Sequence, residues 1–161
     1  MRKVEAGMVF AIQSNINSDK SGRVFKSGNT EVHVIHDGVY GTPSYNRTIK
    51  VLLHDNVIAV FEPSINRVRL SDCGYETATT KSRLNVLIDC FTEASRVFQN
   101  RHVWYQGDDL WMGEHSIKFV HKHPDDCWQL KQAILKAWGE TIPSGIVWGI
   151  GIPSLMILPL F

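Results

Sequence analysis

The sequence has few cysteines and no excess of charge of either sign. Its 161 residues include three cysteines, and 17 lysines and arginines are balanced by 16 aspartates and glutamates. An odd number of cysteines in no zinc-like spacing argues against a disulfide framework and favours a reducing compartment. The balanced charge excludes an acidic mimic of DNA and gives no bulk argument for a nucleic-acid-binding protein.

The N-terminus also lacks the apolar run of a signal peptide. The residues from Met1 to Glu5 are rich in charge, and no apolar stretch of the required length follows them, so secretion is not expected. The chain is instead 43% hydrophobic and 20% charged, which is enough to fill a core and excludes intrinsic disorder. Its length predicts one domain, which we place at residues 1–140.

The last 21 residues, 141–161, contain no charged side chain. About 20 apolar residues is the length of a transmembrane helix. However, Pro143, Pro153 and Pro159, together with three glycines, would interrupt such a helix repeatedly. We therefore expect an apolar C-terminal tail that packs on the domain. Contact with a partner or with a second copy of the chain is the alternative, and a membrane is the least favoured.

Short runs with strand periodicity fill the first half of the chain. Strands are predicted at residues 8–12, 22–26, 31–36, 49–54, 57–62 and 66–70. The sequences 27–30 and 55–56 between them contain the Gly, Asn and Asp residues that tight hairpin turns require. The last three strands, with their short connections, predict an antiparallel meander.

The second half changes to helical spacing. Apolar residues from Leu84 onward predict a helix at about 80–99 with Thr79 or Thr80 as its N-cap. Three more short strands are predicted at 102–106, 109–112 and 116–121. A second helix follows at about 124–138, with Pro124 at its first position. The predicted fold is α+β, an antiparallel sheet with two helices packed on it.

One stretch carries a family pattern. Asn56, Ile58 and Ala59 are followed by Leu70-Ser71, and the run 74–85 reads G-Y-E-T-A-T-T-K-S-R-L-N. This pattern resembles a family of short uncharacterised proteins of tailed bacteriophages. The aromatic segment before Phe119 is similar to a second feature of that family, so the resemblance covers roughly residues 45–121. It implies a phage origin and an accessory role in the cytoplasm of the infected bacterium, and it implies no particular activity.

The start of the first predicted helix is a candidate anion site. Thr79, Thr80, Lys81 and Arg83 would present backbone N–H groups and positive charge at a helix N-terminus. No Gly-rich phosphate loop accompanies them. The alternative is a strand-to-helix corner whose threonines cap the helix and fix its packing.

Two further groups are candidates for binding a partner or a nucleic acid. Arg67 and Arg69 alternate on one strand, with Tyr75 nearby, as on sheets that hold single strands. An ordinary solvated face is the alternative. Trp104, Tyr105 and Trp111 lie in the later strands. They form either a plug of the core or an exposed protein-binding anchor.

Chemistry-bearing residues give little support to an enzyme. His121, His123 and Cys127 are a weak candidate metal site, because their spacing matches no standard zinc module. No serine or cysteine lies in a recognisable nucleophile motif. We therefore predict no catalytic residues and no cofactor.

The leading hypothesis is a non-enzymatic phage protein that binds and inhibits a host bacterial protein, such as an anti-phage defence factor. It would act by steric occlusion, through a surface that includes the aromatic hairpin and the apolar tail. One alternative is a small-ligand or nucleotide sponge that uses the candidate anion site. The other is a single-stranded nucleic-acid-binding protein.

Overall fold

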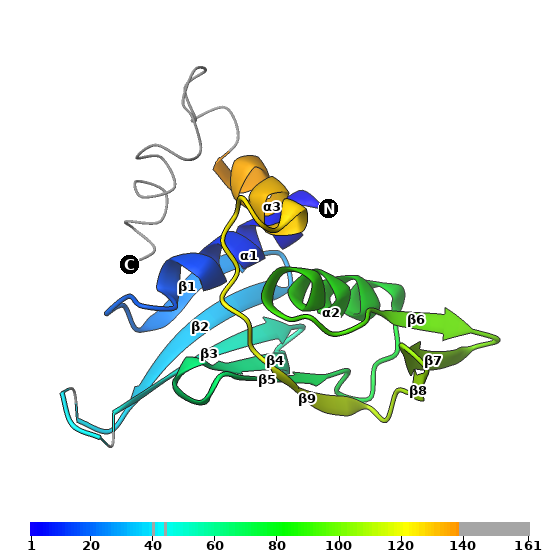
Figure 1. Ribbon diagram of the computed structural model, residues 1–161, viewed down its shortest axis with the longest axis horizontal. Coiled ribbons are helices and arrows are strands. Elements are labelled where there is room, and N and C mark those ends of the chain that lie inside the picture. Colours follow the sequence, from blue (N-terminus) through cyan, green and yellow to red (C-terminus); the bar gives the residue numbers. More distant parts are fainter. Residues whose placement is uncertain (40, 44, 139–161) are drawn as a thin grey trace.

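The computed structural model describes residues 1–39, 41–43 and 45–138 of the chain (Figure 1). Three α-helices and two antiparallel sheets make up this part. The α+β class predicted from the sequence is therefore confirmed, although the helices number three rather than two. The predicted tail at 141–161 lies outside the described residues.

The larger sheet has six strands in the order β1-β2-β3-β4-β5-β9. Its strands are β1 (Gly22–Ser27), β2 (Thr30–Asp37), β3 (Asn46–Leu53), β4 (Asn56–Glu62), β5 (Arg67–Ser71) and β9 (Glu114–Lys118). The first five strands form a continuous meander, which confirms and extends the predicted one, and a short 3₁₀ turn (Pro63–Ile65) joins β4 to β5. The turn after β3 is His54-Asp55, one residue before the predicted pair, and both residues have positive φ.

The smaller sheet has three strands, β6 (Val97–Asn100), β7 (Val103–Gln106) and β8 (Asp109–Leu110). It projects beyond the N-terminal end of helix α2 (Ala78–Phe91), and Figure 1 shows it at the right of the molecule. β9 then returns to the larger sheet by pairing with β5. The smaller sheet is thus formed by the chain segment between β5 and β9, two neighbouring strands of the larger sheet.

The N-terminal segment is helical, so the prediction of a strand at residues 8–12 is wrong. Helix α1 (Lys3–Asn15) packs against β2 on one side and against helix α3 (Trp128–Trp138) on another. Met8, Val9 and Ile12 are therefore all completely buried. A helix covered on more than one side has no clean polar stripe, and its short apolar run is not distinguishable from a strand by periodicity.

Helix α2 begins close to its predicted start and ends eight residues before the predicted position 99. Its N-cap is Thr77 rather than Thr79 or Thr80, since Thr77 Oγ1 accepts the backbone N–H of Thr80 at 3.1 Å. At the other end, Thr92 adopts an extended conformation and its hydroxyl donates to the carbonyl of Ile88 at 2.8 Å. The residues after Thr92 then enter the smaller sheet.

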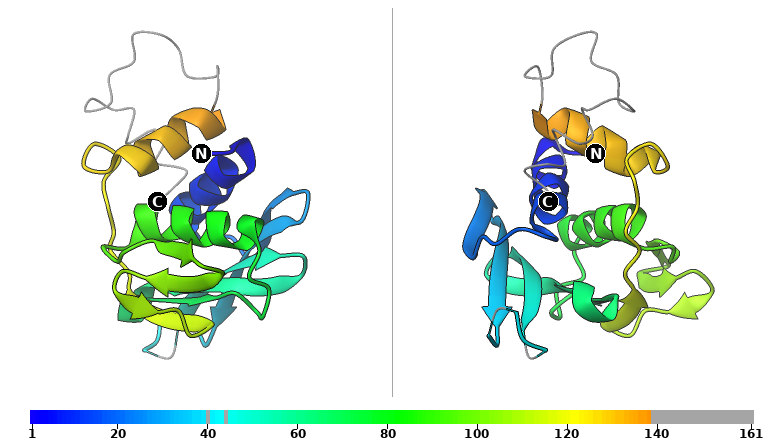
Figure 2. Two further views of the ribbon diagram at one scale, coloured as in Figure 1. Left: turned by 90° about the vertical axis from the view of Figure 1, so that its right-hand side faces the viewer. Right: turned by 60° about the vertical axis from the view of Figure 1, so that its left-hand side comes forward.

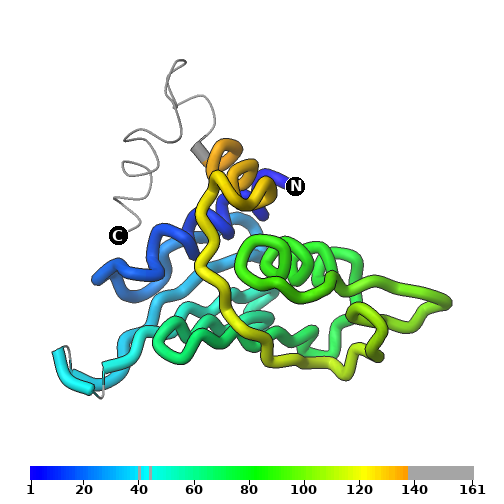
Figure 3. The backbone as a smooth tube through the Cα atoms, viewed as in Figure 1, coloured from blue at the N-terminus to red at the C-terminus, as the bar shows by residue number. Residues whose placement is uncertain are grey.

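Helix α3 begins four residues after the predicted Pro124, which lies instead in a turn. The chain reaches α3 by passing from β9 across the C-terminal end of α2 (Figure 3). The backbone N–H of Val120 donates to the carbonyl of Phe91 at 2.8 Å, and Lys122 Nζ donates to the carbonyl of Asp89 at 2.9 Å. These bonds fasten the connecting segment to the C-terminal half of α2.

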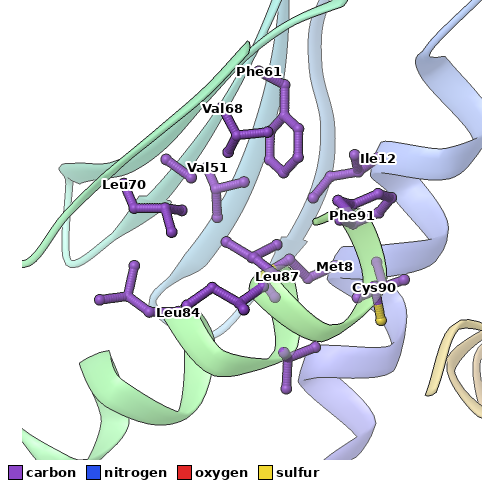
Figure 4. Packing of buried hydrophobic residues seen from close by; sticks show 14 of the residues in the cluster. Met8, Ile12, Val51, Phe61, Val68, Leu70, Leu84, Leu87, Cys90 and Phe91 are labelled. Carbon is purple, nitrogen blue, oxygen red and sulfur yellow. The ribbon is translucent and has the colours of Figure 1, made fainter. Parts of the chain in front are cut away.

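Helices α1 and α2 cover one face of the larger sheet, and α3 packs on both of them on the side away from the sheet (Figure 2). The core lies between these layers. Figure 4 shows side chains of α1 and α2 meeting those of the central strands. The ring of Phe61 packs edge-on against Phe91 with centroids 5.1 Å apart, and Phe119 joins the same cluster. No helix in the described residues is long and apolar enough to span a bilayer.

Candidate functional site

The smaller sheet has an inner face that packs on the domain. Successive residues of a strand point to opposite faces, and Val97, Trp104 and Gln106 are buried. Trp104 is 3% exposed, and Lys81 Nζ lies 5.8 Å from the centroid of its ring. The inner face therefore anchors the sheet against α2.

Asn85 of α2 fixes the position of this sheet. Its side-chain amide donates to the carbonyl of Val97 at 2.7 Å and accepts the N–H of Val97 at 2.6 Å. All four atoms belong to buried residues, so the bonds are shielded from water. Because Val97 is the first residue of β6, the pair sets where the smaller sheet begins.

The outer face of the smaller sheet is apolar and exposed. We use this name for Phe98, Val103, Tyr105 and Leu110. Phe98 pairs with Tyr105 in the register, and Tyr105 pairs with Leu110, so the three side chains form a row across the strands. The exposed fractions of Phe98, Val103 and Leu110 are 45%, 40% and 53%. The rings of Phe98 and Tyr105 stack with centroids 5.7 Å apart, and Met112 just after β8 is 76% exposed.

The sequence identified this hairpin but not which of its side chains face outward. Trp104 and Trp111 are buried, so neither presents a binding anchor at the surface. Trp111 Nε1 instead donates to Asp72 Oδ2 at 2.9 Å, which joins the smaller sheet to the loop after β5. Tyr105 does lie on the outer face, beside Phe98 and Leu110. Phe98 was missed because its spacing continued that of the preceding helix.

Arg67 and Arg69 lie on the helix-free face of the larger sheet, with side chains 44% and 53% exposed. Both pair with one carboxylate, that of Glu62 on β4. Arg67 Nε lies 2.9 Å and Arg69 Nε 3.1 Å from Glu62 Oε1. The hydrogen bond from Arg67 lowers the pKa of Glu62, although partial burial opposes the shift. This pairing offsets part of the positive charge that a nucleic acid would need.

Tyr75 does not lie on that face. It is 58% exposed in the loop between β5 and α2. The described residues pointing outward from β3, β4, β5 and β9 include no aromatic ring. The structure therefore does not bring Tyr75 together with Arg67 and Arg69 as a stacking platform.

The candidate anion residues at the start of α2 are separated by the fold. Arg83 and Thr80 are buried, and Lys81 lies over Trp104. Arg83 Nη1 pairs with Glu5 Oε2 at 2.8 Å, and its Nε donates to Thr30 Oγ1 at 3.2 Å. Arg83 thus ties α1, α2 and β2 together.

Glu5 is held in its charged form by this network. Burial alone would raise the pKa of Glu5, but bonds from Ser82 Oγ, the Arg2 N–H and Arg83 outweigh it and lower that pKa. The Ser82 hydroxyl lies 2.5 Å from Glu5 Oε2. Glu5 and Arg83 are 2% and 7% exposed, so the ion pair is an interior one.

Thr79 lies between two hollows at the start of α2. The larger has a volume of about 480 Å³, and its lining includes His54, Asp72 and Tyr75. The smaller, of about 320 Å³, lies between Thr79, Arg83 and the β1–β2 turn. The larger hollow is within the usual size range of small-molecule sites.

The structure does not assemble His121, His123 and Cys127 into a metal-holding group, and the described residues contain no group of three or more metal-ligating side chains. His123 Nδ1 accepts the N–H of Asp125 at 3.1 Å. Cys127 is buried with its thiol near the carbonyl of Asp89, and the ring of His121 lies beside Phe119. Each of the three residues thus contacts a different neighbour.

Comparison with known proteins places this chain in a family. The family model described as Kyanoviridae Gp96 protein matches residues 1–124. No curated protein and no solved structure matches the chain. The matched range contains α1, α2 and both sheets, including the whole outer face of the smaller sheet, and ends before α3. The chain therefore belongs to the Kyanoviridae Gp96 protein family, a family of phage proteins.

Proposed function

We propose that this chain is a non-enzymatic phage accessory protein that binds and inhibits a host bacterial protein in the cytoplasm of the infected cell. The outer face of the smaller sheet is its binding surface. The observation that carries the proposal is the row in which half-buried Tyr105 lies between exposed Phe98 and Leu110, flanked by exposed Val103. An anti-phage defence factor is one kind of host protein that such binding would block.

An exposed apolar row of this kind favours protein binding. Soluble proteins rarely leave contiguous large apolar side chains in water unless a partner covers them. Aromatic side chains also contribute a large share of the energy at protein interfaces. Phe98 and Tyr105 supply two rings in a fixed, stacked arrangement.

The sheet that carries the row is held rigidly from behind. The two Asn85–Val97 bonds and the buried Trp104 fix its inner face. A surface that is already ordered loses little conformational entropy on binding, so more of the contact energy contributes to affinity. Inhibition would follow by steric occlusion of the host protein's own site.

Co-purification from the bacterial host tests this proposal. The double variant Phe98→Ser/Leu110→Ser removes two members of the row. Ile65→Ser is the matched control, because Ile65 is an exposed apolar residue on the distant 3₁₀ turn. We expect one host protein to co-purify stoichiometrically with the wild type and the control, to be lost with the double variant, and to be inhibited by the wild type. Equal capture by all three chains would exclude the outer face as the binding surface.

A sponge for a small ligand such as a nucleotide is the second candidate. The 480 Å³ hollow at the start of α2 supports it, because Thr79 and Thr80 line the hollow beside His54. A ligand at about 100 times its dissociation constant adds about 2.7 kcal/mol to stability, so mono-, cyclic and dinucleotides would raise the melting temperature. Thr79→Leu would obstruct the hollow and abolish that rise. The absence of any shift across the panel would exclude this candidate.

A further inference from the structure

A groove runs between α1, β1 and the C-terminal end of α3. It encloses about 650 Å³. Its apolar lining comes from Phe10 and Ala11 of α1, Val24 and Phe25 of β1, and Ala137 of α3. The rest of the lining is Gly7 and the polar residues Ser14, Asn15, Lys20, Ser21 and Arg23.

The groove follows from how α1 and β1 meet. A Cβ atom on Gly7 would lie 2.5 Å from Phe25 Cε1, so the missing side chain of Gly7 admits the ring of Phe25 against the helix. Among the residues that the structure describes, β1 is an edge strand that pairs with β2 alone, and its register shifts between Arg23 and Phe25. The groove is thus bounded on one side by a strand edge with backbone groups that a further segment of chain can contact.

The C-terminal end of α3 lies beside this groove. Ala137 lines the groove, and α3 ends at the next residue. Lys136 Nζ donates to the carbonyl of Met1 at 2.5 Å, which holds the end of α3 near the start of α1. Two residues then separate α3 from 141–161, the stretch that carries no charged side chain.

We propose that the segment 141–161 of the same chain occupies this groove and places apolar side chains on Val24, Phe25 and Ala11. A groove of this volume filled only with water would hold about 20 molecules, some of them against the apolar side chains of Phe10, Val24 and Phe25. Replacing that water with apolar side chains is favourable in proportion to the area covered.

The segment 141–161 is favoured over a separate partner as the occupant, because it is covalently joined to α3, which lines the groove. A short covalent link gives an effective local concentration on the order of millimolar. A separate molecule would have to exceed that concentration or bind more tightly. The volume accommodates some of the segment's side chains rather than all of them. This placement does not depend on the proposed function, because the groove and the outer face of the smaller sheet are different surfaces.

Hydrogen exchange on the full chain and on a chain that stops after residue 140 tests the placement. With the segment removed, we expect loss of protection in residues 7–15 and 20–25, which form the groove. Residues 97–112 of the smaller sheet are the internal control and should exchange at unchanged rates, with both chains monomeric. Chains that stop after residue 153 then map which half of the segment contributes the contact.

Three outcomes would overturn the proposal. Unchanged exchange at 7–15 and 20–25 would show that the segment does not cover the groove. A change confined to 97–112 would place it on the smaller sheet. Groove protection that disappears on dilution, together with a dimer mass, would assign the groove to the segment of a second copy.

A second variant keeps the test decisive if the shortened chain does not fold. Val24→Asp introduces a charge into the groove of the full chain, and Val103→Asp introduces the same charge on the smaller sheet as the control. The account predicts faster exchange around the groove in Val24→Asp and not in Val103→Asp. Equal behaviour of the two variants there would overturn the proposal.

Discussion

The two sheets differ most in what their outer faces present to water. On the larger sheet, Arg67 and Arg69 share the carboxylate of Glu62, and the face is mainly charged and polar. On the smaller sheet, the corresponding face carries Phe98, Val103, Tyr105 and Leu110. The inner faces carry the buried side chains, such as Val68 and Leu70 on the larger sheet and Val97 and Trp104 on the smaller one. The two sheets are therefore alike in burying apolar side chains on their inner faces, and they differ in the side chains of their outer faces.

This contrast indicates that the outer face of the smaller sheet is the better candidate for a binding surface. A charged outer face with internal ion pairs satisfies the ordinary requirement for solubility and needs no partner. An apolar outer face costs solubility, and a soluble protein retains one where a partner covers it. Substitutions on the two faces should therefore differ in their effects on stability and on binding.

Substitutions of two neighbouring residues of β7 should differ most in how far they lower the free energy of unfolding. Trp104→Ala removes a fully packed indole, and we expect it to lower the free energy of unfolding by about 3–5 kcal/mol. Tyr105→Ala, on the outer face, should lower it by about 1 kcal/mol or less. Urea unfolding of the two variants measures both values. Equal losses would mean that the two faces are equally buried and that the outer face is not free to bind.

The buried ion pair beneath the larger sheet should give an effect of similar size. Arg83→Ala leaves the carboxylate of Glu5 without its cation, and we expect a loss of about 3–5 kcal/mol in the free energy of unfolding. The double variant Glu5→Leu/Arg83→Met replaces both charges with apolar side chains and should recover most of that loss. A double variant as unstable as Arg83→Ala would show that the charges themselves hold the helices together.

The same pair should make stability depend on acidity. Because the pKa of Glu5 is lower in the folded chain than the ordinary value of 4.5, its charged form stabilises the fold above that value. This contribution is lost as the pH falls through the lowered pKa. The melting temperature of the wild type should therefore fall more between pH 5 and pH 3 than that of Glu5→Gln. Parallel curves for the two chains would contradict the assignment.

The smallest effect on stability is expected on the outer face of the smaller sheet. Phe98→Ser/Leu110→Ser removes exposed apolar area, so the free energy of unfolding should change by only about 1 kcal/mol in total. The same variant should resist salting-out better than the wild type, because the exposed apolar patch is gone. Thermal unfolding and ammonium sulfate solubility check both points. A large loss of stability would mean that the row packs within the domain.

Much of the fold was predictable because its signals are local. The hairpins from β1 to β5 follow from alternating apolar residues and from turn residues such as Gly28 and Asn29, which need no distant contact to be recognised. Helix α1 could not be recognised as a helix, because α3, more than a hundred residues away in sequence, covers what would otherwise be its polar stripe.

The candidate site was predictable only in part, for a similar reason. The aromatic hairpin is evident in the sequence, but which side of it faces outward depends on how Trp104 packs against α2. The Asn85–Val97 pair sets that packing, and the end of α2 at Thr92 frees Phe98 for β6. These are contacts between different elements, and the periodicity of one segment does not contain them.

Site-specific photo-crosslinking in the bacterial host compares the two outer faces most directly. A photoreactive residue replaces Phe98 on the smaller sheet in one chain and Val60, between Lys50 and Arg69 on the larger sheet, in another. The account predicts one discrete host-protein adduct from position 98 and none from position 60. A discrete adduct from position 60 with none from position 98 would contradict it.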